Sequence, residues 1–192
     1  MKILNKNSEA FLQRYLDNHA PTGYESSGQK IWLDYLKPYV DEIHLDNYGS
    51  AYGVINPGKD YRVVIEAHAD EISWYVNYIT EDGFINVVRN GGSDHQIAPS
   101  MRVQIHTKSG VVKGVFGWPA IHLRKGKDAN LAPSLENIFV DIGAKNKEEV
   151  LKKDIHVGCV ITFEDSLTTL NDRFIVGRAL DNRMGGFCIA QV

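Results

Sequence analysis

Two polar residues that can hold a metal ion follow a short apolar run in the first half of the chain. The run Val63-Val64-Ile65 is apolar and β-branched, which predicts a strand buried on both faces. His68 and Asp70 come after it, and alternate residues of a strand project to the same face. A neutral imidazole can bind a divalent cation there, while the carboxylate accepts the other ring N–H and fixes the tautomer. The spacing alone is equally typical of a strand that ends in a polar loop.

A second apolar run, far along the chain, ends in similar chemistry. Residues 174–179 predict another buried strand, and Asp181 follows it. Ligands of open α/β sheets bind outside the carboxyl ends of the strands. We therefore expect the two strands to be neighbours in one sheet, with His68 and Asp181 within reach of a shared cation. A carboxylate can also bridge two cations that activate one water. The simpler structural explanation of Asp181 is an N-cap for the following helix.

The composition is that of an ordinary globular protein. The chain has 192 residues, of which 43% are hydrophobic and 23% charged, and this size suits one large or two small domains. A net charge of −3 without a basic cluster gives no reason to expect nucleic acid as a partner. No stretch resembles a signal peptide or a membrane span, so we expect no membrane partner. Cys159 and Cys188 are too few for a disulfide framework, which favours a cytoplasmic location.

The elements around these motifs predict an α/β domain, a sheet with flanking helices. Apolar residues at helical spacing predict one helix with Ser8 as its N-cap and a second that ends before Pro38. The expected helices span residues 8–19 and 26–36, and the expected strands residues 40–45 and 51–55. We expect residues 1–70 and 165–192 to form this catalytic domain. The apolar helix predicted for 184–192 has no glycine or basic residue at its end, so we interpret the chain as truncated at its C-terminus.

The middle of the chain has a different pattern of apolar residues. Ile72, Trp74, Val76 and Tyr78 alternate with other residues in a two-residue period, and a hairpin signal follows at residues 81–83. The further expected strands span residues 84–88, 102–106, 111–116, 138–141 and 157–163, with one short helix at 147–153. Many short strands with regular turn signals are typical of a barrel or sandwich. We therefore expect residues 71–164 to form an inserted all-β, barrel-like module.

Six stretches of the chain resemble the tetrahedral (TET) aminopeptidase family, which includes glutamyl aminopeptidases and proteins labelled endoglucanase M. They are Ala20-Pro-Thr-Gly-Tyr-Glu25, Asp46-Asn-Tyr-Gly-Ser50, Ala67-His-Ala-Asp-Glu71, Gly91-Gly-Ser-Asp-His-Gln96, Phe139-Val-Asp-Ile-Gly-Ala144 and Ala179-Leu-Asp-Asn-Arg183. The resemblance implies a metal-dependent aminopeptidase that removes N-terminal residues from short peptides, with two divalent ions, zinc or cobalt, as cofactors. It implies that the β-module is a dimerisation domain and that dimers assemble into a larger, tetrahedral particle.

The resemblance also implies roles for three residues. His68 would ligate one metal ion, Asp181 would bridge the pair, and Asp70 would be a catalytic-site residue that steers the imidazole. In this family the general-base Glu, a Glu ligand, another acidic ligand and a final His follow the motif that contains Asp181. No residue after Asp181 in this sequence is Asp, Glu or His. Because a catalytic zinc needs about three protein ligands, we expect the 192-residue chain alone to be inactive. Glu66 is the one upstream carboxylate that could substitute.

Two alternative functions remain open at the level of sequence. Asp70 and Asp181 could serve as the carboxylate pair of an endo-acting glycoside hydrolase, which requires a separation of about 5–5.5 or 6.5–9.5 Å. The chain could instead be a non-catalytic assembly or binding fragment, which the missing ligands favour. Ser93, His95 and Ala120 depart from the family pattern and put details of the substrate pocket in doubt.

Overall fold

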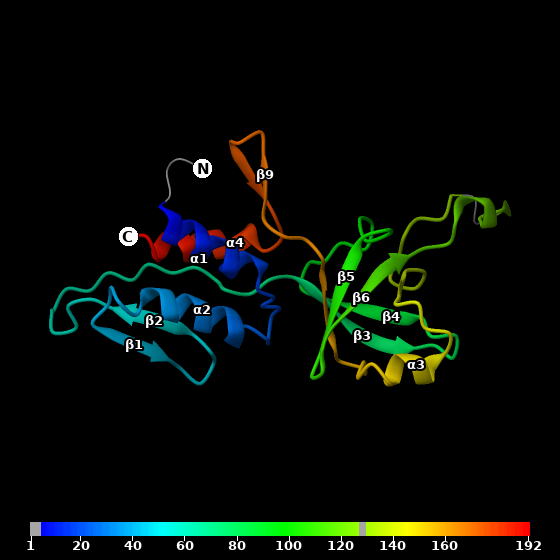
Figure 1. The fold of residues 1–192 in the computed structure, drawn as a ribbon, viewed down its shortest axis with the longest axis horizontal. Coiled ribbons are helices and arrows are strands. Elements are labelled where there is room, and N and C mark those ends of the chain that lie inside the picture. The colour runs from blue at the N-terminus through cyan, green and yellow to red at the C-terminus, as the bar shows by residue number, and fades with distance from the viewer. Residues whose placement is uncertain (1–4, 127–129) are drawn as a thin grey trace. The chain divides into compact units, whose positions relative to one another are not determined.

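The computed structural model describes residues 5–126 and 130–192, and the chain divides into two compact units (Figure 1). The first unit comprises Met1–Glu71 and Asp165–Val192, and the second, the barrel unit, comprises Ile72–Glu164. Within the described part of the chain, no helix has both the length and the apolar character needed to cross a membrane.

The barrel unit is a closed six-stranded barrel, which confirms the prediction of an all-β, barrel-like module. Its strands are β3 (Ser73–Ile79), β4 (Ile85–Asn90), β5 (Arg102–Thr107), β6 (Gly110–Gly117), β7 (Phe139–Asp141) and β8 (Val160–Phe163). They close in the order β3-β4-β7-β6-β5-β8, and every neighbouring pair is antiparallel. A 3₁₀ turn η1 (Ile121–Leu123) and helix α3 (Lys147–Leu151) lie in its connections. The short strand β7 closes the barrel by pairing with β4 at Ile85 and with β6 at Val115–Gly117.

Alternate residues of the strands fill the barrel core, and within β3 the alternation shifts by one residue. Trp74 and Val76 are buried in the barrel core, as the alternation predicts. A register shift between Val76 and Tyr78 then turns the strand by one residue, so that Tyr78 is exposed and Ile79 is buried instead. An extra residue in one strand reverses the alternation beyond it, and it leaves little trace in the sequence.

The first unit packs three helices around one apolar cluster. Its helices are α1 (Lys6–Asp17), α2 (Ser26–Leu36) and α4 (Leu180–Ile189), and its strands are β1 (Glu42–Leu45), β2 (Ala51–Val54), β9 (Thr168–Leu170) and β10 (Phe174–Val176). Phe11, Trp32 and Phe187 bring the three helices together. The predicted N-cap Ser8 is wrong: the side chain of Asn5 accepts the Ser8 N–H at 2.9 Å, and the Ser8 hydroxyl is buried and donates to Gln191.

The two buried strands expected to carry the site do not form as predicted. Val63, Val64 and Ile65 are 70%, 83% and 59% exposed, and Figure 1 draws this stretch as a trace without an arrow. None of the backbone–backbone hydrogen bonds among the described residues involves residues 61–66. β10 does form, but its Phe174 and Val176 are exposed and it pairs only with β9.

These runs are therefore not neighbouring strands of one sheet. A strand requires a neighbour to satisfy its N–H and C=O groups and a second layer to cover its side chains. In the first unit, the β1–β2 hairpin and the β9–β10 hairpin each pair internally and offer residues 61–66 no such neighbour.

The barrel core provides a test of this packing. We expect Ile105→Ala, at a fully buried site of β5, to lower the free energy of unfolding of the barrel unit by about 2–5 kcal/mol. Ile97→Ala removes the same atoms at an exposed site of this unit and should change it by less than about 0.5 kcal/mol. Chemical denaturation followed by hydrogen exchange of the barrel strands measures both values. Equal losses in the two variants would contradict the assignment of the core.

Candidate metal centre

His68 contacts both of the acidic residues predicted to share its site. Its Nδ1 lies 2.8 Å from Oδ1 of Asp70, and its Nε2 lies 3.2 Å from Oδ1 of Asp181. The structure thus brings the three predicted residues together, although residues 63–65 form no strand and β10 pairs only with β9. The His68 side chain is 54% exposed and that of Asp181 is 97% exposed, so the site is open to solvent.

The distances around His68 suit a cation between its ring and Asp181. A neutral imidazole carries one proton, and with that proton donated from Nδ1 to Asp70 the Nε2 atom presents a lone pair. Nε2 then faces a carboxylate oxygen, so two acceptors stand 3.2 Å apart. Two ligands of one tetrahedral zinc ion stand about 3.4 Å apart, given Zn–N and Zn–O bonds of about 2.0–2.2 Å. A nitrogen and an oxygen at this separation fit a shared divalent ion.

Both carboxylate oxygens of Asp70 accept hydrogen bonds, one of them from the imidazole of His68. Its Oδ1 accepts from His68 at 2.8 Å, and its Oδ2 accepts from the Thr22 hydroxyl at 2.5 Å. Partial burial acts to raise the pKa of Asp70, but the hydrogen bonds from Thr22 and His68 outweigh it and lower the pKa below its usual value. Asp70 is therefore an ionised acceptor at neutral pH, which suits a group that fixes a ligand tautomer.

Asp181 is not the N-cap of the helix that follows it. The backbone of α4 is non-helical at Asp181 and Asn182, so its regular turns begin after Asn182, whose Oδ1 accepts the Gly185 N–H at 3.2 Å as an N-cap does. Asp181 itself has a non-helical backbone, with φ −92° and ψ 108°. Its carboxylate is consequently available to a ligand, as its exposure also shows.

A buried cluster of charges lies next to this site, and sequence analysis missed it. Glu71 is 4% exposed, and its carboxylate accepts from Arg178 at 2.6 and 2.5 Å and from Arg183 at 2.8 Å. The same carboxylate accepts the backbone N–H of Ala20 at 2.7 Å. Two cations and a backbone donor therefore compensate one buried anion, as a buried carboxylate requires.

Arg183 extends this cluster to the end of α1 and to the segment that carries His68. It is fully buried and donates to the carbonyl oxygens of Tyr15, Asn18 and Ala69. Burial lowers the pKa of Arg183, and the Glu71 carboxylate opposes that change. Because Ala69 is next to His68 and Arg183 is two residues from Asp181, these bonds set where the two candidate ligands meet. In the sequence, this cluster is visible only as Glu71 directly after the first motif and as Arg178 and Arg183 on either side of Asp181.

The remaining candidates do not extend the site. Within residues 5–126 and 130–192, no group of three or more His, Cys, Asp and Glu side chains is arranged to hold a metal ion. Glu66 is exposed. In the barrel unit, Asp94 accepts the N–H of Gln96 at 2.8 Å in a local turn, and His122 is exposed on η1. The described chain therefore supplies two ligand-type side chains and an orienting carboxylate.

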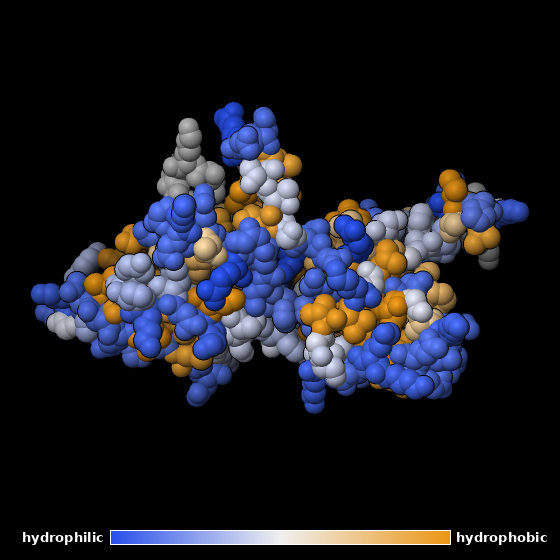
Figure 2. Space-filling model, viewed as in Figure 1, coloured by the Kyte–Doolittle hydropathy of each residue, from blue (hydrophilic) through white to orange (hydrophobic). Residues whose placement is uncertain are grey.

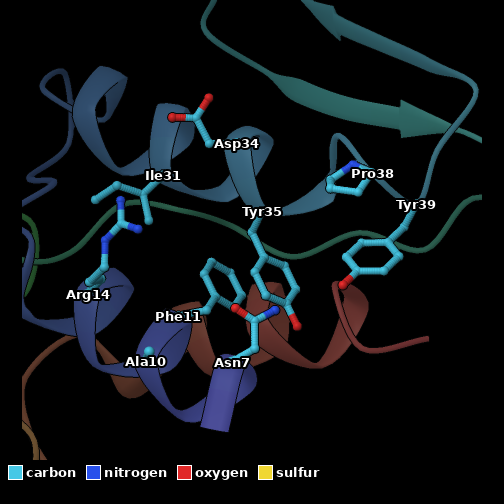
Figure 3. A pocket seen from close by; sticks show the side chains of 9 residues that line it. All are labelled: Asn7, Ala10, Phe11, Arg14, Ile31, Asp34, Tyr35, Pro38 and Tyr39. Atoms are coloured by element: carbon cyan, nitrogen blue, oxygen red, sulfur yellow. The ribbon is translucent and has the colours of Figure 1, made fainter. Parts of the chain in front are cut away.

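A surface hollow of about 230 Å³ lies between α1 and α2 and is separate from these residues. Figure 3 shows Phe11 and Tyr35 face to face in its wall, with ring centroids 3.9 Å apart. None of His68, Asp70 and Asp181 lines it. We assign the hollow no role in the metal centre.

Comparison with known proteins identifies the family to which the chain belongs. The sequence profile described as M42 glutamyl aminopeptidase matches residues 49–192, and the chain belongs to this family. It is 34% identical over 182 residues to the putative aminopeptidase FrvX of Escherichia coli K12, covering 94% of this chain and 51% of the relative. It is 29% identical over 175 residues to the lysyl aminopeptidase of Pyrococcus furiosus, covering 90% of this chain and 50% of that protein.

A solved structure shows the same fold. The TET aminopeptidase from the marine sediment archaeon Thaumarchaeota archaeon SCGC AB-539-E09 matches with a TM-score of 0.91 at 25% identity. The match covers 96% of this chain and 52% of that one. The chain thus spans about half the length of the relatives that it matches.

The buried charge cluster leads to a stability prediction. Glu71→Gln removes the carboxylate that compensates the fully buried Arg183, so we expect the first unit to lose about 3–5 kcal/mol of unfolding free energy. Glu42→Gln is the matched control, because Glu42 contacts only His44 in an exposed pair and should change stability little. Hydrogen exchange of α1 and α4 amides under denaturant measures both variants. A Glu71→Gln protein as stable as the control would contradict this role.

Proposed function

We propose that this chain carries part of the catalytic centre of a metal-dependent aminopeptidase that releases N-terminal residues from short peptides. The observation that carries the proposal is the pairing of His68 Nε2 with Asp181 Oδ1 at 3.2 Å, in a chain of the M42 family. Bound divalent ions, zinc or cobalt, would polarise the scissile carbonyl and lower the pKa of a water. The likeness to the lysyl aminopeptidase supports the reaction class.

The residues of this chain have distinct tasks in that function. His68 would bind one ion through Nε2, because Asp70 holds the proton on Nδ1. Asp181 has two carboxylate oxygens in solvent and could bind a second ion with the oxygen that does not face His68. Asp70 does not contact the ions in this arrangement and acts by orienting the ring. The general base and the other ligands lie outside the described residues in this proposal, because those residues contain no third ligand at the site.

A glycoside hydrolase would require different chemistry from the same residues. Its general acid is a carboxyl group whose pKa is raised so that it is protonated at working pH. Asp70 shows the opposite, because its pKa is lowered by two hydrogen bonds that occupy both oxygens. That function would also leave His68 without a task. The site therefore favours the peptidase.

A chimera tests the function. Residues 1–192 would replace the matching half of the Pyrococcus furiosus lysyl aminopeptidase, which supplies the part of the relative that this chain lacks. We expect the chimera to release N-terminal residues from short peptides in a chelator-sensitive reaction, and the 192-residue chain alone to show no activity. His68→Ala and Asp181→Asn should each lower kcat/KM by more than about 100-fold, since they remove ion ligands.

His44→Ala is the control for these variants, because His44 is an exposed histidine of the same unit that pairs with Glu42. It should leave the activity of the chimera unchanged. Cleavage of β-glucan in place of peptides, or peptide cleavage that survives a chelator, would contradict the proposed reaction. Chelator-sensitive activity of the 192-residue chain alone would show that the half-site suffices.

We also propose that the barrel unit carries contacts of a homo-oligomer, with dimers that assemble into a larger, possibly tetrahedral, particle. Apolar side chains interrupt its polar surface (Figure 2), and Ile97, Ile121 and Leu123 are exposed. Such contacts would bury these side chains against a second copy of the chain.

Light scattering tests the oligomer. We expect a dimer or larger particle for the chain, and a lower mass for the double variant Ile121→Asp/Leu123→Asp, because two charges would be buried in the contact. Tyr48→Asp, at an almost fully exposed residue of the first unit, is the matched control and should keep the mass of the parent. A folded, monomeric parent chain would refute the proposal.

A further inference from the structure

Hydrogen bonds join the turn Ala20-Pro21-Thr22 to Glu71, at the end of the segment that carries His68 and Asp70. The Glu71 N–H donates to the Ala20 carbonyl at 3.0 Å, and the Thr22 N–H donates to the Glu71 carbonyl at 3.3 Å. Pro21 and Glu71 form a parallel β-bridge. The Ala20 N–H donates to the Glu71 carboxylate at 2.7 Å. Backbone and side-chain bonds together therefore hold this turn against the end of the candidate metal segment.

This fastening places the Thr22 hydroxyl against Asp70. Thr22 Oγ1 donates to Oδ2 of Asp70 at 2.5 Å, while Oδ1 of the same carboxylate accepts from His68. A chain of contacts thus runs from Thr22 through Asp70 and His68 to Asp181. In this chain of contacts, Thr22 and Asp181 stand at opposite ends.

The second hydrogen bond matters because Asp70 is only partly enclosed. Its side chain is 31% exposed, so a carboxylate held by His68 alone could rotate and pair with water. Two bonds on opposite oxygens fix the plane of the carboxylate and leave Oδ1 directed at the ring. The imidazole proton is then held on Nδ1, and the Nε2 lone pair faces Asp181.

We propose that Thr22 is a positioning residue of this site, which keeps Asp70 oriented so that His68 presents its Nε2 lone pair to a divalent cation. The inference rests on the proposed function where it treats His68 as a metal ligand. It adds a residue outside the His68–Asp70 and Asp181 motifs, on the turn that connects α1 to α2. Thr22 acts through its hydrogen bond to Asp70.

The test compares two variants of the 192-residue chain. Thr22→Val keeps the shape of the side chain and removes its hydroxyl, whereas Thr22→Ser keeps the hydroxyl. Because Thr22 is exposed, neither change should unfold the unit. Thr168→Val is the matched control, since Thr168 is an exposed threonine of the same unit whose hydroxyl bonds the Ser166 carbonyl at 3.4 Å.

Two measurements separate positioning from general damage. In the metal-free protein, ring ¹⁵N shifts of neutral His68 should report the Nδ1–H tautomer in the parent, a mixture in Thr22→Val and the parent tautomer again in Thr22→Ser. In titration calorimetry with Zn²⁺ alone, Thr22→Val should bind about 10–100-fold more weakly than the parent, and Thr22→Ser and Thr168→Val should bind as the parent does. His68→Ala defines the baseline without this ligand.

Each outcome decides a separate point. A shift of tautomer in Thr22→Val that Thr22→Ser reverses supports the positioning role. An unchanged tautomer in Thr22→Val overturns it, whatever the affinity. Equal losses of Zn²⁺ affinity in Thr22→Val and Thr168→Val also overturn it, because the effect would then be general. If the parent binds Zn²⁺ no better than His68→Ala while the tautomer responds to Thr22, the proposed function fails and the role of Thr22 in orienting Asp70 stands.

Discussion

The buried pair of Glu71 and Arg183 is the interaction on which the first unit and its site depend. Each charge lowers the cost of burying the other, and the bonds of Arg183 to three backbone carbonyls satisfy donors that water cannot reach. The pair joins the end of α1, the segment before Glu71 and the start of α4. The geometry of His68 and Asp181 follows from it, because one lies three residues before Glu71 and the other two residues before Arg183.

In the candidate centre, hydrogen bonds hold the residues that support the imidazole, while the candidate ligands are exposed to solvent. Below the imidazole, Asp70 is held by Thr22, and Glu71 is held by two arginines. Above it, His68 and Asp181 face solvent. The exposed apolar run Val63-Val64-Ile65 leads directly into this open face.

Most of the local elements could be predicted from the amino-acid sequence. Apolar periodicity predicted α2 and the strands of the barrel to within a few residues, because burial on one face imposes a period of 3.6 or 2 on the chain. It also indicated the His68–Asp70 contact, since two residues of spacing suffice to bring an imidazole and a carboxylate together. It missed the register shift after Val76 and placed the first N-cap at Ser8 when Asn5 forms it. The first depends on one extra residue in a strand and the second on one side-chain hydrogen bond, and neither leaves a periodic pattern.

The approach of His68 to Asp181 could be explained only from the folded structure. The prediction that His68 and Asp181 would approach each other assumed two neighbouring buried strands, and those strands do not exist as a pair. The contact arises instead from Arg183, Arg178 and Glu71, which lie more than 100 residues apart across the two motifs. Thr22 reaches Asp70 over 48 residues in the same way. Charge and hydroxyl pairs at such separations have no period, so composition and spacing cannot reveal which residue will be buried against which.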